Sequence, residues 1–147
     1  TVNILTNFAY NKKIINIFGG EQYRPNLHID DMCRLYELLI FSDTKRINGE
    51  IFNAGVQNLK VSEIASMVKK IVEGHINEEV KLNFTESNDK RSYRVTSDKI
   101  EDMLNFNMKK NVEDAINDIC IGFKNNTIKN SFDEKFSNIK VLQKLNF

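Results

Sequence analysis

The sequence predicts an α/β fold, because segments with helical periodicity alternate with short extended segments along its 147 residues. In the helical segments the apolar residues recur at helical spacing, whereas the extended segments are short apolar runs or alternate apolar with polar residues. The paired glycines Gly19 and Gly20 mark a tight turn between two of the extended segments. With 41% hydrophobic residues, the chain is long and apolar enough to bury a core.

The first half of the chain opens with a helical pattern. The expected elements are a helix over 2–12, a strand over 14–18, an extended segment over 23–29 and a helix that begins at 30. Pro25 fixes its own φ and holds Arg24 outside the helical region, which keeps the third segment extended. We expect Asp30 to cap the following helix and Asp31 to favour the positive end of its dipole. The apolar face of that helix is wide enough to pack against a sheet.

The second half continues the alternation. The expected elements are a strand over 51–55, a helix capped by Ser62 and ended by Gly74, a half-buried strand over 79–85, a polar loop over 87–94, and two helices capped by Ser97 and Asn111. We expect residues 1–126 to form the main unit. The remaining 127–147 is a polar extension that forms one weak amphipathic helix around 136–145 or docks on something outside this chain.

The composition argues against several classes of function. The 21 basic and 20 acidic residues give a net charge of +1, which argues against binding to nucleic acid or to an anionic membrane. No apolar run approaches the roughly 20 residues of a membrane-spanning helix. Cys33 and Cys120 fall inside helical patterns and match no metal-binding spacing. We expect two reduced, buried thiols, no metal site, and a cytoplasmic protein.

The stretch from Gly20 to Asp31 reads G-x-Q-x-R-P-x-x-H-I-x-D. Further motifs follow in order: FN-x-G within 51–55, a helix start at 61–65, D-x-R-x-Y-x-x-x-x-x-K over 89–99, and helix-forming segments at 103–106 and 112–116. Together they resemble the extended short-chain dehydrogenase/reductases, the NAD-dependent sugar-nucleotide epimerases and dehydratases. The resemblance covers residues 1 to about 124. It implies the C-terminal, substrate-binding part of such an enzyme, with the last Rossmann elements and a small α/β lobe.

The resemblance implies a site for the nucleotide diphosphate of a sugar nucleotide. In the family, arginines from the first and third motifs help to bind the diphosphate, and here they are Arg24 and Arg91. The planar guanidinium suits this role because it makes paired hydrogen bonds to phosphate. Gln22 shares a strand face with Arg24 and is expected to contact the nucleotide or its ribose, and Tyr93 to line the pocket.

Simpler interpretations exist for the same residues. Arg24 is equally suited to an ion pair at the strand end, with Glu21, Asp30 or Asp31 as its partner. Arg91 lies in a charged run, and such runs are usually solvated surface. We interpret His28 as a structural residue and the two aspartates as a helix N-terminus rather than an acid–base pair.

The catalytic parts of the family are absent from this sequence. The six glycines form no glycine-rich dinucleotide-binding motif. The family's catalytic Tyr-x-x-x-Lys is also missing, because the residues four positions after the tyrosines are Ile14, Leu27, Ile40 and Ser97. We therefore assign no catalytic or cofactor-binding residue here. The expectation is a cut from a longer protein whose N-terminal Rossmann half binds NAD.

The sequence thus predicts the substrate-binding part of an NAD-dependent sugar-nucleotide epimerase (an isomerase) or dehydratase (a lyase), inactive alone. Its expected partners are the sugar nucleotide and the Rossmann half, and a homodimer of the full enzyme stays open. The helix from Asp30 and the strand at Ile51 are expected to pack on that half, so their apolar faces would be exposed here. This exposure predicts marginal stability or self-association of the chain alone. The alternatives are a stand-alone binding or assembly module derived from this domain, or an unrelated small α/β domain.

Overall fold

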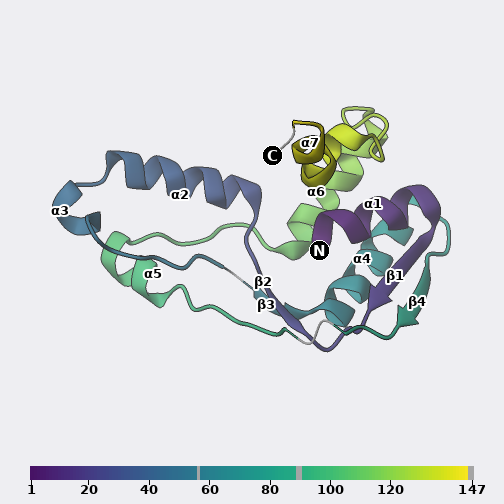
Figure 1. Cartoon of the computed structure of the whole chain (residues 1–147), viewed down its shortest axis with the longest axis horizontal. Coiled ribbons are helices and arrows are strands. Elements are labelled where there is room, and N and C mark those ends of the chain that lie inside the picture. Colours follow the sequence, from purple (N-terminus) through teal and green to yellow (C-terminus); the bar gives the residue numbers. More distant parts are fainter. Residues whose placement is uncertain (56, 89–90, 146–147) are drawn as a thin grey trace.

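The computed structural model describes residues 1–55, 57–88 and 91–145. Helices and short strands alternate along the chain, as the sequence predicts. In order, the elements are α1 (Val2–Lys12), β1 (Ile14–Phe18), β2 (Tyr23–Asn26), α2 (Ile29–Phe41), α3 (Thr44–Ile47), β3 (Gln57–Lys60), α4 (Val61–Ile76), β4 (Lys81–Thr85), α5 (Asp98–Leu104), α6 (Val112–Lys124), the 3₁₀ turn η1 (Glu134–Phe136) and α7 (Asn138–Lys144) (Figure 1).

The strands form two separate pairs. β1 and β4 run parallel, with Ile14 opposite Lys81 at one end. β2 and β3 run antiparallel, with Tyr23 opposite Lys60, and we call this pair the ribbon. A parallel pair needs a long connection, and here that connection contains α2, α3, the ribbon and α4.

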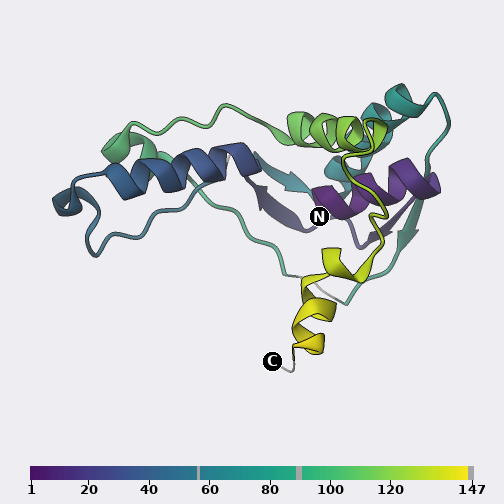
Figure 2. The same ribbon diagram turned by 90° about the horizontal axis from the view of Figure 1, so that it is seen from above.

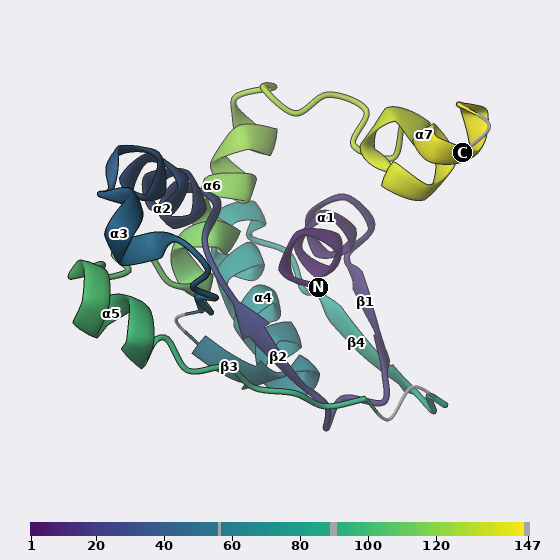
Figure 3. The ribbon, with the colours of Figure 1, turned by 60° about the vertical axis from the view of Figure 1, so that its left-hand side comes forward.

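The body of the molecule consists of α1, α4, α6 and the β1–β4 pair (Figure 3). The three helices pack against one another, and both α1 and α4 contact β1. Their apolar stripes form the larger core. Its buried members are Val2, Leu5, Ala9, Ile15, Ile17, Val61, Ile64, Ala65, Val68, Val72, Val80, Val112, Ile116 and Cys120. The three helices and β1 therefore each bury one face inside the chain itself, whereas β4 stays largely exposed.

The arm consists of α2, α3 and α5, and it extends to one side of the body at the end of the ribbon (Figure 2). Its core is small: Leu35, Ile100, Leu104 and Phe106. The opposite face of α2 exposes apolar side chains, with Ile40 74% exposed and Tyr36 60% exposed. Ile51, on the strand-like stretch after α3, is 81% exposed. This confirms the expected exposure of the α2 helix and of Ile51.

The predicted strand over 51–55 does not form. No strand of the described chain lies beside it, and a β-strand requires a neighbour for its backbone groups. Pairing begins instead at Gln57, where β3 meets β2. The sequence pattern of a strand is present at 51–55, but its backbone partner is not.

Two of the predicted helix starts are wrong. His28 rather than Asp30 caps α2, since its Nδ1 accepts the Asp30 N–H at 3.1 Å. α4 begins at Val61, before Ser62, and Lys60 is its N-cap residue.

The predictions for the end of α4 and for the caps of α5 and α6 have different outcomes. α4 continues past Gly74 to Ile76 and ends at Asn77 in a left-handed conformation. Ser97 precedes α5 as predicted, but its hydroxyl bonds to the backbone of Gly55 instead of to the helix. The predicted Asn111 cap of α6 is confirmed by a reciprocal pair of hydrogen bonds with Asp114.

The cysteines differ from each other. Cys120 is buried, and burial raises the pKa of its thiol to about 11. Cys33 is exposed on α2, so the prediction that it is buried was wrong. Both are free thiols, and no described helix is long and apolar enough to cross a membrane.

The C-terminal extension forms a short helix within the predicted 136–145 region, α7, and the 3₁₀ turn η1 precedes it. Its first part docks on α1: the ring of Phe132 lies 5.2 Å from that of Phe8, and the Ser131 hydroxyl donates to the Asn7 side chain at 2.6 Å. α7 itself keeps its apolar residues exposed, with Ile139 71% exposed. The last two residues, 146–147, lie outside the described chain.

Candidate functional site

The glycine turn fixes where β2 begins. Gly19 and Gly20 have φ values of +75° and +118°, which a side chain disfavours. The amide of Gln22 closes this turn, because its Oε1 accepts the Gly20 N–H at 2.7 Å and its Nε2 donates to the Phe18 carbonyl at 2.8 Å. The predicted contact of Gln22 with a nucleotide stays a prediction, beside this structural role.

The structure brings three of the four predicted site residues together. Nη1 of Arg24 donates to the carbonyl of Arg91 at 2.7 Å, across 67 positions in sequence. The same guanidinium lies over the ring of Tyr93, with 5.2 Å from its central carbon to the ring centroid. The side chain of Gln22, the fourth residue, bonds instead to the turn that precedes β2.

The segment over 91–95 follows the ribbon. The hydroxyl of Ser92 accepts the Tyr23 N–H at 3.0 Å. Asn58 on β3 and Val95 exchange two hydrogen bonds, 2.9 and 3.0 Å long. These contacts hold Arg91 and Tyr93 against β2 without forming a regular strand. Asp89 and Lys90, the start of the predicted motif, lie outside the described residues.

Arg94 adds a further cation to this region, and sequence reasoning did not single it out. Its guanidinium carbon lies 3.7 Å from the ring centroid of Tyr23. This stacking could not be predicted from the charged loop alone, because the ring comes from a distant strand. We call Tyr23, Arg24, Arg91, Tyr93 and Arg94 the β2 cluster.

Three carboxylates near Arg24 in sequence pair with other cations among the described residues. Glu21 pairs with Lys60 at 2.7 Å, and this hydrogen bond raises the pKa of the lysine. Asp31 pairs with Arg34, and Asp30 lies 3.9 Å from Lys110. Each of the three carboxylates that the sequence offered to Arg24 is thus engaged with another cation.

The β2 cluster combines planar cations with aromatic rings. Guanidinium groups bind phosphate and carboxylate through paired hydrogen bonds, and exposed rings stack on planar groups of a ligand. Tyr93 is 54% exposed, so its ring is accessible. The arrangement suits an anionic ligand that carries a ring.

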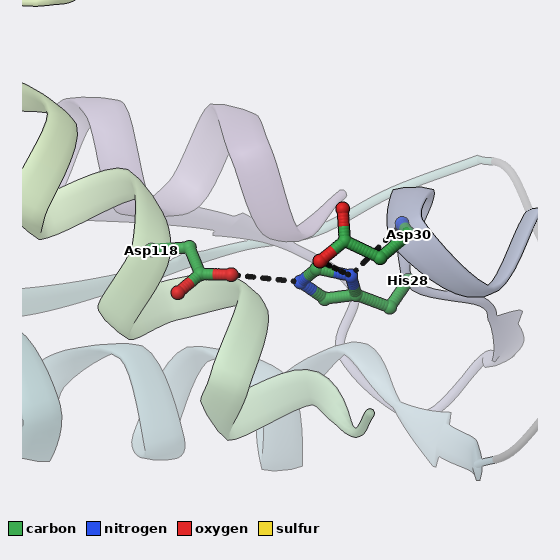
Figure 4. Close-up of side chains that lie close together, drawn as sticks. All are labelled: His28, Asp30 and Asp118. Carbon is green, nitrogen blue, oxygen red and sulfur yellow. Dashed lines mark hydrogen bonds and ion pairs between the residues drawn. The ribbon is translucent and has the colours of Figure 1, made fainter. Parts of the chain in front are cut away.

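A second group of polar side chains lies where the ribbon meets α2 (Figure 4). Nε2 of the buried His28 lies 3.3 Å from Oδ2 of Asp118 on α6, and Nδ1 lies 3.8 Å from Oδ2 of Asp30. A cavity of about 550 Å³ opens beside the ring, with mostly apolar walls from α1, α2 and α6. The three side chains have the atoms of a metal site, but the ammonium of Lys110 already lies 3.3 Å from Asp118 Oδ2. This group is an ion-pair cluster, and sequence reasoning missed Asp118.

Comparison with known proteins finds similar solved structures but no matching family model or curated sequence. No protein-family model matches the sequence. No curated protein matches it either.

Several solved enzymes share the fold. UDP-glucose 4-epimerase from Thermotoga maritima, solved with UDP-glucose, superposes with a TM-score of 0.67 at 23% identity, over 86% of this chain and 40% of that one. UDP-glucuronic acid 4-epimerase from Bacillus cereus, solved with UDP-glucuronic acid and NAD, gives 0.68 at 23% identity, over 82% and 38%. This chain has the fold of a part of these enzymes. The predicted fold class is thereby confirmed.

The fold does not by itself select one reaction. L-threonine dehydrogenase from Phytophthora infestans gives a TM-score of 0.70 at 9% identity, over 84% of this chain and 40% of that one. This chain spans 35–42% of the length of these solved structures. The function of this chain therefore has to be argued from its site and not from the fold alone.

Proposed function

We propose that this chain is the substrate-binding part of an NAD-dependent sugar-nucleotide epimerase or dehydratase. In this proposal Arg24 and Arg91 bind the nucleotide diphosphate. The observation that carries the proposal is the meeting of these two residues, with Tyr93, on the edge of the ribbon. Two motifs far apart in sequence converge at one place in a fold shared with sugar-nucleotide epimerases.

A diphosphate needs fixed cations, and the β2 cluster supplies them on a rigid support. Arg24 stands on a strand that is paired on one side with β3 and on the other with the 91–95 segment. A guanidinium held in this way loses little conformational freedom when it binds phosphate. The rings of Tyr23 and Tyr93 lie against the cations and limit their rotation further.

NAD does not fit this chain. A dinucleotide site uses a glycine-rich turn between a strand and a helix N-terminus, whereas the Gly19–Gly20 turn leads into the strand β2. We therefore assign NAD and the catalytic tyrosine and lysine to a Rossmann half that packs on the exposed face of α2. Bound there, NAD would supply hydride-transfer chemistry to the sugar held by this chain.

Calorimetric titration with UDP and UDP-glucose tests the binding claim. Arg24→Ala and Arg91→Ala should each weaken binding by about 10- to 100-fold, since a charge-assisted hydrogen bond contributes roughly 1.5–3 kcal/mol. Lys45→Ala, a charge removed from the arm, is the matched control and should leave the affinity unchanged. Uridine, which lacks the diphosphate, should bind far more weakly than UDP.

Equal affinity for uridine and UDP, or full binding by both arginine variants, would overturn the proposal. L-threonine is the informative competitor because a threonine dehydrogenase shares the fold. Binding of L-threonine in place of UDP would point to a different enzyme. Addition of NAD and sugar nucleotides to the chain alone should give no turnover.

A further inference from the structure

The arm and the body have separate apolar cores. No buried residue belongs to both the core of the arm and the core of the body. Figures 1 and 2 show the arm reaching away from the body, joined to it by the ribbon and by two extended connections. The contacts where α2 begins join the arm directly to α6 of the body.

We propose that a group of polar contacts between α2 and α6, which we call the joint, sets the orientation of the arm. His28 contacts both helices, and Asp118 is its partner on α6. The joint consists of His28, Asp30, Asp31, Lys110 and Asp118. It does not depend on the proposed function, because it concerns how the chain holds its own parts.

His28 faces both elements at once. Its side chain is 3% exposed, and its Nδ1 accepts the Asp30 N–H as the cap of α2. Since a neutral imidazole carries one proton, that acceptor role leaves the proton on Nε2. Nε2 faces Oδ2 of Asp118 at 3.3 Å (Figure 4). One ring thus caps the first helix of the arm and contacts the last helix of the body.

Lys110 balances the two carboxylates around this ring. Its Nζ lies 3.3 Å from Oδ2 of Asp118 and 3.9 Å from Oδ2 of Asp30. The hydrogen bond to Asp118 raises the pKa of Lys110. The lysine connects the start of α2 with α6 in the same way as the histidine does.

Asp31 holds the joint from its other side. Its buried carboxylate accepts the N–H groups of Lys109 and Lys110, each at 2.9 Å, and also pairs with Arg34. These backbone groups belong to the connection that leads from the arm into α6. The first turn of α2 is therefore tied both to α6 and to the residues just before it.

Distance measurements between spin labels test the proposal on the intact chain. One label is placed on the arm and one on the body, at Lys45→Cys and Lys70→Cys, both of which are exposed. Cys33→Ser removes the exposed native thiol, and the buried Cys120 stays unlabelled. The parent should show one narrow distance distribution.

Two variants loosen the joint from opposite sides. His28→Asn keeps a good helix-capping residue but removes the ring that contacts α6. Asp118→Ala removes the carboxylate on α6 that contacts His28 and Lys110. Each should broaden the distance distribution by about twofold or more, because local opening then costs less free energy. Glu113→Ala, which removes another exposed carboxylate from α6, should keep the parent distribution.

A parent-like distribution in Asp118→Ala would overturn the proposal. This variant decides the matter even if His28→Asn loses helix content, because alanine at a half-exposed position of α6 favours the helix. Circular dichroism confirms the fold of each variant. Broadening in the Glu113→Ala control as well would also contradict a specific joint.

Discussion

The body and the arm bury their apolar residues in different ways. In the body, α4 carries a stripe of four aliphatic or alanine residues at zero exposure, covered by α1 and α6 of the same chain. In the arm, α2 buries Leu35 but leaves Ile40 and Phe41 more than 70% exposed. The helices of the body enclose a large core, whereas the small core of the arm leaves a wide apolar face of α2 exposed. We therefore expect unequal stability in the two regions.

The largest expected effect is in the body core. Ile64→Ala should destabilise the chain by about 2–5 kcal/mol, because it removes a fully buried side chain and leaves a cavity. Ile40→Ala, the matched change on the exposed face of α2, should alter the free energy of unfolding by less than about 0.5 kcal/mol. Urea unfolding measures both. Similar losses for the two variants would contradict the division into a closed body and an open arm.

The next effect concerns the joint and its pH dependence. Burial alone would raise the pKa of Asp31, but the backbone hydrogen bonds from Lys110 and Lys109 and the Arg34 pair bring it below the usual 3.8. Stability from this group is therefore present above that value and is lost as the pH falls through the lower, folded-state pKa.

Asp31→Asn should destabilise the chain by roughly 1–3 kcal/mol at neutral pH and flatten its acid sensitivity below about pH 4. The check is urea unfolding at neutral and acidic pH for the variant and its parent. An unchanged pH profile in the variant would show that Asp31 does not carry this dependence.

The smallest effect on stability, and the sharpest on assembly, is expected on the exposed face of α2. Ile40→Glu should leave the free energy of unfolding almost unchanged but lower any self-association of the chain, since the exposed apolar face is the surface that would associate. Sedimentation velocity over a range of concentrations measures this. A parent chain that stays monomeric and melts sharply would show that the α2 face needs no cover.

The sequence was informative wherever a pattern is local. The stripes of α4 and α6 and the strand β1 were predicted because their periodicity is set by neighbouring residues and one covered face. The capping of α6 by Asn111 could likewise be predicted, since its partner Asp114 lies within the same turn.

The sequence was misleading where a partner lies far away in the chain. Residues 51–55 have the composition of a strand, but their pairing depends on a neighbour that the described chain does not provide. Cys33 falls in a helix with apolar residues on both faces, and periodicity cannot tell which face is covered. The contact between His28 and Asp118 left no signal, because each residue alone is ordinary in its local pattern.

The central claim is that the β2 cluster binds a nucleotide diphosphate, and mapping amide chemical shifts on titration with UDP tests it most directly. We expect the largest shifts on Tyr23, Arg24 and the 91–94 segment, with little change on α4 and α7. Shifts confined to the arm or to the cavity beside His28, or no shifts at all, would contradict diphosphate binding at the β2 cluster.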